Sequence, residues 1–224
     1  MNRLFLVRHG GSTANADESY YAFHDSAVCL TTEGVRQALN TAGMLAEVGG
    51  PSWLKPGNFN LEVYASEYSR TQQTARICLD QMGVLSVEPK IRAVLNERNY
   101  GIPFNGQADI DPNSDANGSE SAVRARTRVK GFIREIEPIL ERADVLAFSH
   151  KGTVRSLLAN LRGLSDEEMM QIDVSNGSVF VFNRTPTVDG GSTWTEVKDL
   201  PDPVIAKAAP VIEPPPVEPP KAAR

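Results

Sequence analysis

Short apolar runs alternate with longer amphipathic segments through most of this chain. The short runs are typical of buried β-strands and cover residues 3–7, 61–65, 84–87, 144–148, 178–182 and 194–197. The longer segments carry apolar residues at three- and four-residue steps, which predicts helices over 32–48, 67–82, 119–142 and 153–161. Because strands alternate with helices, we expect an α/β fold: a three-layer sandwich whose mostly parallel central sheet has helices on both faces.

Capping and breaking residues set the expected ends of these helices. Thr31 or Thr32 is a suitable N-cap for the first predicted helix, and a glycine pair follows its last turn. Ser66 is expected to cap the second helix. Pro138 is expected to kink the last turns of the third, because proline removes a helical hydrogen bond.

The end of the chain differs in composition from everything before it. Residues 201–224 hold eight of the fifteen prolines and no aromatic residue. This composition is typical of an extended, polyproline-type or disordered tail. We therefore expect one folded domain over residues 1–200 and a Pro-rich tail, which is either passive or a docking segment for a partner's groove.

Charge, cysteine content and hydropathy exclude several classes of protein. The net charge is −5, which argues against a nucleic-acid binder, because affinity for a phosphate backbone needs clustered positive charge. Cys29 and Cys78 fit no metal-ligand spacing and are expected to be reduced thiols. The apolar run at 4–7 is too short for a signal peptide, and no other stretch is long enough to span a bilayer. We expect a cytoplasmic protein without nucleic-acid or membrane partners.

Two of the three histidines directly follow predicted strands. His9 comes after the strand at 3–7, with Arg8 before it, and His150 comes after the strand at 144–148. In open α/β sheets, ligands bind outside the carboxyl ends of the strands. We therefore expect both imidazoles to lie at the same edge of the sheet and to share a site.

This combination of residues suits phosphoryl transfer. A neutral imidazole is a capable nucleophile near neutral pH. Phosphoryl transfer mainly requires positioning and positive charge around the equatorial oxygens, which Arg8 and a second arginine can grip. Neighbouring guanidinium charge should also keep His9 unprotonated. A carboxylic acid is then needed to protonate the leaving oxygen, whereas no metal or other cofactor is required.

Six segments resemble the histidine phosphatase superfamily, the phosphoglycerate mutase-like enzymes, in that family's order and spacing. They are LVRHGGSTAN at 6–15, LTTEGVRQA at 30–38, ASEYSRTQQTA at 65–75, LNERNYG at 95–101, GSES at 118–121 and FSHKG at 148–152. The resemblance covers most of residues 1–183 and implies a metal-independent phosphoric monoester hydrolase.

The resemblance also implies roles for individual residues. His9 would be the nucleophile that becomes phosphohistidine, and Glu97 the general acid for the leaving group and then the base for water. The phosphoryl group would be bound by Arg8, Ser12, Asn15, Arg70 and His150.

Three positions depart from the family pattern or have another expected role. Gly11 stands where many members carry a side chain, so the rim beside His9 should be more open. Lys151 stands where glycine is common, and is either an exposed charge or an extra cation for the substrate. Glu120 is expected to cap a helix or orient a neighbour rather than to act in catalysis.

Aromatic residues are the candidates for contact with the rest of the substrate. Tyr21 and Phe23 lie between the first motif and the first predicted helix, and Phe104 follows the LNERNYG motif. Surface packing is the alternative to a role in substrate binding. As a hypothesis, these rings form part of the pocket for the leaving group of a small phosphorylated substrate.

The main alternative to hydrolysis is phosphoryl transfer by a cofactor-dependent phosphoglycerate mutase, whose sequence residues 96–101 resemble. Those mutases carry an arginine pair and a Pro-rich insertion after this stretch, but residues 102–111 contain no arginine. A mutase needs cations for a second phosphate, so hydrolysis through phosphorylated His9 is the expected function. A non-catalytic binding module that acts through the Pro-rich tail is a second alternative.

Overall fold

A six-stranded sheet forms the centre of the computed structural model, which describes residues 2–16, 25–50, 53, 60–100, 119–188 and 190–197. The strands are β1 (Arg3–Arg8), β2 (Leu61–Ala65), β3 (Lys90–Ile91), β4 (Asp144–Ser149), β5 (Val179–Pro186) and β6 (Ser192–Glu196). Their order in the sheet is β3-β2-β4-β1-β5-β6. The first four in this order are parallel, and β5 and β6 are added antiparallel.

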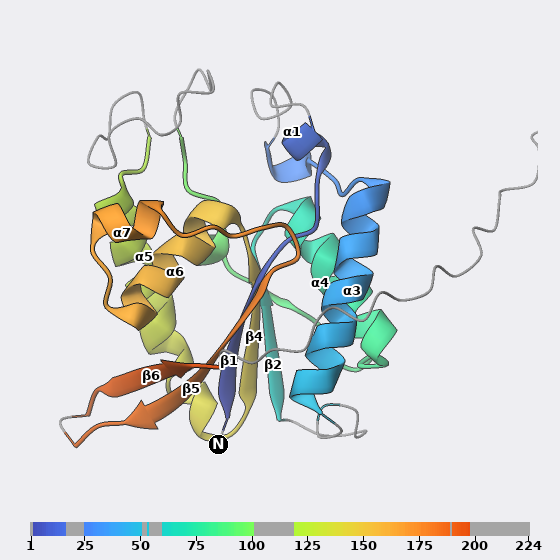
Figure 1. The fold of residues 1–224 in the computed structure, drawn as a ribbon. Coiled ribbons are helices and arrows are strands. Elements are labelled where there is room, and N and C mark those ends of the chain that lie inside the picture. The colour runs from blue at the N-terminus through green and yellow to red at the C-terminus, as the bar shows by residue number, and fades with distance from the viewer. Residues whose placement is uncertain are drawn as a thin grey trace, which may run out of the picture.

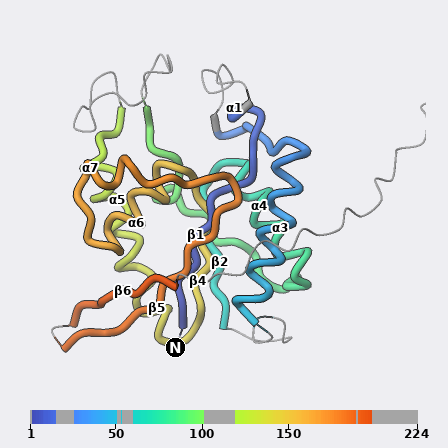
Figure 2. Tube along the Cα trace, viewed as in Figure 1, coloured from blue at the N-terminus to red at the C-terminus, as the bar shows by residue number. Residues whose placement is uncertain are grey.

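Helices cover both faces of the sheet (Figures 1 and 2). The α-helices are α1 (Thr13–Ala16), α3 (Thr32–Gly49), α4 (Ser69–Met82), α5 (Ala122–Ile136), α6 (Lys151–Arg162) and α7 (Asp166–Met170), and the 3-10 helices are η2 (Asp25–Ala27), η4 (Ala93–Leu95) and η6 (Ile139–Glu141). One face packs against α3 and α4, and the other against α5 and α6. The predicted α/β sandwich is confirmed.

The central strand β1 explains why its sequence is a continuous apolar run. Leu4 and Leu6 enter the core beneath α5 and α6, whereas Phe5 and Val7 enter the core beneath α3 and α4. All four side chains are fully buried. A strand that is covered on both faces has no solvent side, so its residues do not alternate between apolar and polar.

Both ends of α3 agree with the sequence. Thr31 is the N-cap, and its hydroxyl oxygen accepts a hydrogen bond of 3.0 Å from the backbone nitrogen of Gly34. At the other end Gly50 has φ of 74°, a conformation that side-chain-bearing residues rarely adopt. The helix therefore ends at the predicted glycine pair.

The predicted cap at Ser66 is wrong. Helix α4 begins at Ser69, and its N-cap is Tyr68. The Ser66 hydroxyl lies 2.8 Å from Nε2 of His150 and accepts a hydrogen bond from the Tyr68 backbone nitrogen. From sequence alone, a serine just before a helix could be either an N-cap or a partner for a distant side chain. The position of β4, which ends just before His150, decides between these two roles.

Two further boundaries also differ from expectation. Helix α5 ends at Ile136, and Pro138 precedes the separate 3-10 helix η6 rather than kinking a longer helix. The predicted strand at 84–87 is absent from the described part of the sheet. Its place beside β2 is taken by β3, where Lys90 and Ile91 pair with the end of β2.

The amino end of the sheet carries a compact polar network. Oδ1 of Asp144 accepts a 2.6 Å hydrogen bond from the Arg3 backbone nitrogen. Its Oδ2 accepts hydrogen bonds from Trp53 Nε1 at 2.8 Å and from the Arg3 guanidinium at 3.4 Å. Opposite charges thus neutralise each other at the start of β1 and β4.

The Pro-rich segment 201–224 lies outside the described residues, so the division at residue 200 stays a prediction. Within the described ranges, no helix combines the length and the apolar character needed to cross a membrane.

Candidate active site

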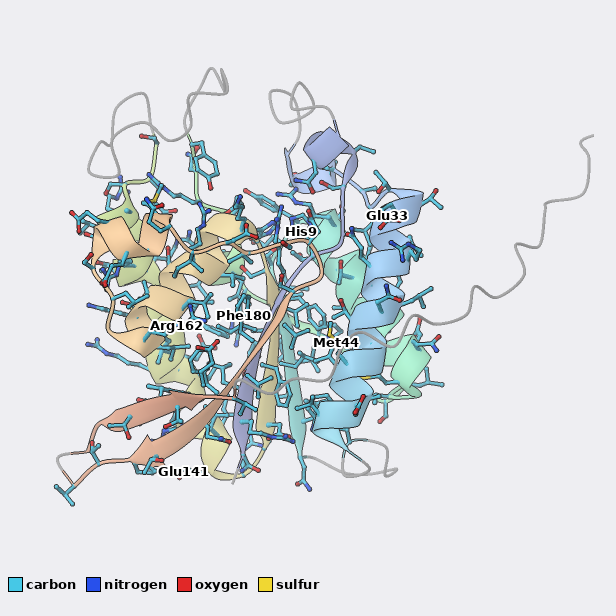
Figure 3. All side chains as sticks on the ribbon, viewed as in Figure 1. His9, Glu33, Met44, Glu141, Arg162 and Phe180 are labelled. Carbon is cyan, nitrogen blue, oxygen red and sulfur yellow. The ribbon has the colours of Figure 1, made fainter. Side chains whose placement is uncertain are left out.

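His9 and His150 lie side by side at the carboxyl end of the sheet. Strands β1 and β4 are parallel neighbours in which Arg8 is paired with Ser149, so the next residues leave the sheet together. The ring centroids of the two histidines are 5.0 Å apart. Their exposed fractions are 2% and 0%. Figure 3 shows His9 beyond the end of β1, far from the N-terminus marked in Figure 1. The predicted shared location is what the structure shows.

Two contacts determine which nitrogen of His9 carries its proton. Nδ1 lies 2.6 Å from the carbonyl oxygen of Gly10, which can only accept a hydrogen bond. Nε2 accepts a hydrogen bond of 3.3 Å from Nε of Arg70. Nδ1 is therefore the protonated nitrogen, and Nε2 presents its lone pair toward the guanidinium group.

Burial and positive charge keep both rings neutral. Burial is the main cause that lowers the pKa of His9 well below its ordinary value, and the charges of Arg70 and Arg8 lower it further. Burial is also the main cause of the low pKa of His150, to which the same two arginines contribute. A second positive charge in a buried cationic site is unfavourable, so the imidazoles are uncharged near neutral pH.

Arg70 comes from the first turn of α4 and is 1% exposed. Its guanidinium carbon lies 4.9 Å from the ring centroid of Tyr68. The same ring lies edge-on to His150, with centroids 5.0 Å apart. Tyr68 therefore packs against both groups, although it is not among the site residues predicted from the sequence. Its position two residues before Arg70, within the ASEYSRTQQTA motif, is the sequence feature that could have identified it as a site residue.

Arg8 is held by a loop that comes from the far end of the chain. Nη1 of Arg8 donates a 2.6 Å hydrogen bond to the carbonyl oxygen of Val174. In the same loop, Asn176 donates to the carbonyl oxygen of His9 at 3.1 Å, and the Gly177 backbone nitrogen donates to the carbonyl oxygen of Arg8 at 3.1 Å. This loop was not predictable from the sequence, since a polar segment between two elements has no periodic pattern.

Ser12 and Asn15 form a tight turn after the His9 motif. The backbone nitrogen and the hydroxyl of Ser12 both donate to Oδ1 of Asn15, at 3.0 and 2.9 Å. Asn176 also donates to this oxygen, at 3.3 Å. The turn is thus tied to the loop that supports Arg8 and His9. The roles of Ser12 and Asn15 in phosphate binding stay predictions.

The side chain of Glu97 is hydrogen-bonded to the start of α6, the helix that begins directly after His150. Its Oε1 accepts backbone hydrogen bonds from Arg98 at 2.8 Å, Gly152 at 3.0 Å and Thr153 at 3.3 Å. Two of these donors belong to the first turn of a helix, where the helix dipole also favours a negative charge. The predicted acid is therefore held against the first turn of α6, which follows His150 in the chain.

Gly152 is required by the close approach of Glu97. A Cβ at this position would lie 2.8 Å from Oε1 of Glu97 and 2.7 Å from the hydroxyl of Tyr100. Gly11 is different, because a Cβ there would come no closer than 3.4 Å to a neighbour. A side chain is therefore sterically tolerable at Gly11, in agreement with the expected open rim.

One nitrogen of His150 has an unmet hydrogen-bonding need. Nε2 is occupied by Ser66, whose hydroxyl is also 2.6 Å from that of Thr71. Nδ1 is buried, and the described part of the protein offers it no hydrogen-bond partner. Buried polar atoms without partners are rare and costly, so this atom is suited to a bound ligand.

The remaining predicted site residues have no contact that tests them. Lys151 is the first residue of α6 and is half-buried next to His150. Tyr21, Phe23 and Phe104 lie outside the described residues, so their role in substrate binding stays a prediction. Among the residues that the structure describes, no group of three His, Cys, Asp or Glu side chains is arranged to hold a metal ion.

Comparison with known proteins defines the class. Residues 4–195 match the family model of the histidine phosphatase superfamily (branch 1), so the chain belongs to this superfamily. The predicted membership and the predicted enzyme class, a phosphoric monoester hydrolase of the histidine phosphatase type, are both confirmed.

Individual relatives carry two kinds of name. A 2,3-bisphosphoglycerate-dependent phosphoglycerate mutase of Bartonella henselae is 31% identical over 214 residues, which cover 86% of this chain and 98% of the relative. An adenosylcobalamin/alpha-ribazole phosphatase of Escherichia coli is 30% identical over 191 residues, covering 78% and 86%. A mycobacterial glucosyl-3-phosphoglycerate phosphatase solved with inorganic phosphate shares the fold, with a TM-score of 0.65, 19% identity and coverage of 88% and 96%.

Proposed function

We propose that this protein hydrolyses a phosphomonoester through a phosphohistidine intermediate on His9, without a metal ion. One observation carries the proposal: Nε2 of a neutral, buried His9 presents its lone pair 3.3 Å from the Arg70 guanidinium, with His150 alongside. A nucleophile with this tautomer and these neighbours suits attack on an electron-poor phosphorus atom.

The phosphoryl group would bind among the cations that surround the two rings. The guanidinium groups of Arg8 and Arg70 lower the pKa of both histidines, which means that both act on this small volume. Nδ1 of His150 supplies a further polar contact. Positive charge and donors that are fixed before the reaction stabilise the negative oxygens of the transition state.

The reaction proceeds in two displacements. In the first, Nε2 of His9 bonds to phosphorus while the bond from phosphorus to the leaving oxygen breaks. Glu97 gives that oxygen a proton carried on Oε2, because Oε1 already accepts three backbone hydrogen bonds. In the second, Glu97 takes a proton from water as the water oxygen bonds to phosphorus, the bond to Nε2 breaks, and inorganic phosphate leaves. The carboxyl group ends as it began.

The anchored position of Glu97 supports this role. Three backbone N–H groups donate to Oε1, and two of them, those of Gly152 and Thr153, lie two and three residues after His150 in α6. A general acid must be held close to the leaving oxygen, and a side chain fixed by several hydrogen bonds is restricted to one position.

A phosphoglycerate mutase activity is the second candidate, because relatives with 28 to 31% identity carry that name. A mutase transfers the phosphoryl group back to a phosphorylated acceptor and so needs cations for a second phosphate. The segment 102–111, where the mutases have an arginine pair, has none in this chain. This difference, together with the phosphatase-named relative from Escherichia coli, favours hydrolysis.

A panel of small phosphorylated metabolites, with His9→Ala as the blank and a chelator in parallel wells, tests the proposal. We expect release of inorganic phosphate that survives the chelator and disappears in the variant. In the same plate, 3-phosphoglycerate with catalytic 2,3-bisphosphoglycerate tests the mutase reaction. Formation of 2-phosphoglycerate faster than phosphate release would favour the mutase instead. Partner capture by His9→Ala through the tail would support a binding module.

A further inference from the structure

An ion pair between Arg128 of α5 and Glu120, which precedes this helix, contacts the turn that carries Glu97. Arg128 and Glu120 make two parallel hydrogen bonds of 2.7 Å each. Their side chains are 23% and 15% exposed, so water screens the pair only in part. The third nitrogen of the guanidinium, Nη1, donates to the carbonyl oxygens of Val94 at 2.6 Å and Asn96 at 3.2 Å. Arg128 therefore binds the carboxylate on one side and the backbone before Glu97 on the other.

The backbone after Glu97 is held by the same acidic residue. The Arg98 side chain donates from Nε to the carbonyl oxygen of Glu120 at 2.6 Å. The backbone nitrogen of Glu120 donates to the carbonyl oxygen of Asn99 at 2.7 Å. The chain on both sides of Glu97 is therefore fastened to Glu120 and Arg128.

A third contact joins this turn to the histidine side of the site. Thr153 on α6 donates through its hydroxyl to the carbonyl oxygen of Asn96 at 2.6 Å. The carbonyl of Asn96 thus receives donors from α5 and from α6, one residue before Glu97. The position of Glu97 relative to His150 depends on this carbonyl and on the backbone donors of α6.

We propose that Glu120 and Arg128 are positioning residues for Glu97, and that their ion pair holds the carboxyl group at the leaving-group side of the site. The inference rests on the proposed role of Glu97 as the general acid. Neither residue is expected to contact the phosphoryl group. Arginine is required because only its planar fork can bind a carboxylate with two nitrogens and a carbonyl with the third.

A displaced general acid has a specific kinetic consequence. Protonation matters most when the leaving oxygen is a strong base, and it matters little when the leaving group is stable as an anion. Phenyl phosphate and p-nitrophenyl phosphate have nearly the same shape, but phenoxide is the stronger base. Loss of positioning should therefore slow the first substrate more than the second, whereas general structural damage should slow both equally.

The test compares the wild-type enzyme with Arg128→Lys and Glu120→Gln on these two substrates. Arg128→Lys keeps the positive charge and removes the fork. In both variants we expect kcat/KM for phenyl phosphate to fall by about 30- to 100-fold, because misplacing a catalytic group by about 1 Å costs about this much. For p-nitrophenyl phosphate we expect a change of less than about threefold, because this leaving group needs little protonation.

Arg126→Lys is the matched control. Arg126 lies on the same helix and has a similar set of contacts, with Asp166 at 2.5 Å and the carbonyl oxygen of Leu164 at 2.8 Å. It fastens α7 rather than the Glu97 turn. Arg126→Lys should lower the melting temperature to a similar extent and slow both substrates equally or not at all. Selective loss in this control, or equal loss in Arg128→Lys, overturns the positioning role.

Two catalytic variants separate this inference from the proposed function. His9→Ala should abolish hydrolysis of both substrates, and Glu97→Gln should slow phenyl phosphate selectively. If Glu97→Gln shows no selectivity, the assignment of the general acid is wrong. If Glu97→Gln is selective and Arg128→Lys is not, the general acid stands and the positioning role is wrong.

Discussion

The two ends of the central sheet handle buried charge in opposite ways. At the amino end, Asp144 accepts hydrogen bonds from Arg3 and from the Trp53 ring, so opposite charges meet within one network. At the carboxyl end, two neutral histidines lie among guanidinium groups, and the arginine charges that act on the rings all lower their pKa values. The same two strands, β1 and β4, supply residues to both ends.

This difference indicates that the amino end contributes to stability and the carboxyl end to function. A paired and hydrogen-bonded charge can support the folded state, whereas concentrated positive charge and an unpartnered buried nitrogen cost stability. A protein can tolerate this loss of stability at a site where a bound ligand compensates for it. Here the ligand would be an anion, because the surrounding charge is positive. We therefore propose that the carboxyl end is a preformed anion site, whereas the amino end is an ion-paired network that supports the fold.

Exchanging an arginine at each end gives the largest expected contrast. Arg70→Met should lower kcat/KM by about 10³-fold, because it removes a fixed charge from the transition state. Arg3→Met should lower the melting temperature and leave kcat/KM unchanged. Steady-state kinetics with p-nitrophenyl phosphate and thermal unfolding measure both. An Arg70 variant with normal kinetics would remove the distinction between the two ends.

Inorganic phosphate should stabilise the protein through the carboxyl end alone. A ligand present at 100 times its Kd raises the free energy of unfolding by about 2.7 kcal/mol. We expect this gain in the wild-type protein and in Arg3→Met, and its loss in Arg70→Met. Thermal unfolding across a phosphate titration measures the effect. Equal stabilisation of all three proteins would show that phosphate binds elsewhere.

Glycine substitutions test how closely the parts of the site are packed. Gly152→Ala should lower kcat/KM by about 10- to 100-fold, because the new methyl group displaces Glu97. Gly11→Ala is the matched control beside His9 and should be tolerated, since its nearest neighbour is 3.4 Å away. Kinetics of both variants with phenyl phosphate provide the comparison. Similar losses in both would contradict the assigned packing.

The contribution of a single histidine ring to the pH dependence of stability is the smallest predicted effect. Burial, aided by nearby arginine charge, lowers the folded-state pKa values of His9 and His150. Below about pH 6.5 the unfolded chain therefore binds a proton on each ring that the folded protein does not. The free energy of unfolding should fall toward acid by about 1.4 kcal/mol per pH unit for each ring, and stay constant above that pH.

Urea unfolding from about pH 7.5 to about pH 5.5 measures this slope. The substitution His150→Asn should reduce the pH slope of the free energy of unfolding by the contribution of one ring. An unchanged slope in the variant would mean that His150 takes up its proton equally in the folded and unfolded states, contrary to its burial among cations.

Strands β1 and β4 and the histidine pair were predictable because their physics is local. Strands β1 and β4 are buried on both faces, so they appear in sequence as short apolar runs. A residue that directly follows such a run lies at the carboxyl edge of the sheet, which was enough to bring His9 and His150 together.

Other parts of the site depend on contacts that no local pattern encodes. Ser66 has the sequence signature of a helix cap, but its hydroxyl contacts His150, which follows a different strand. Arg128 reaches the Glu97 turn from a helix more than thirty residues away in sequence. Asn176 supports the His9 backbone from a polar loop. These roles follow from tertiary packing, which single-residue preferences do not describe.

The most direct test is to look for the covalent intermediate on His9. The enzyme is mixed rapidly with p-nitrophenyl phosphate, quenched in base and digested, and the peptides are analysed by mass spectrometry. We expect a phosphoryl group on His9 that is stable in base, labile in acid and absent from His9→Ala, which should also be inactive. Full hydrolytic activity in His9→Ala, or phosphorylation of a different residue, would contradict it.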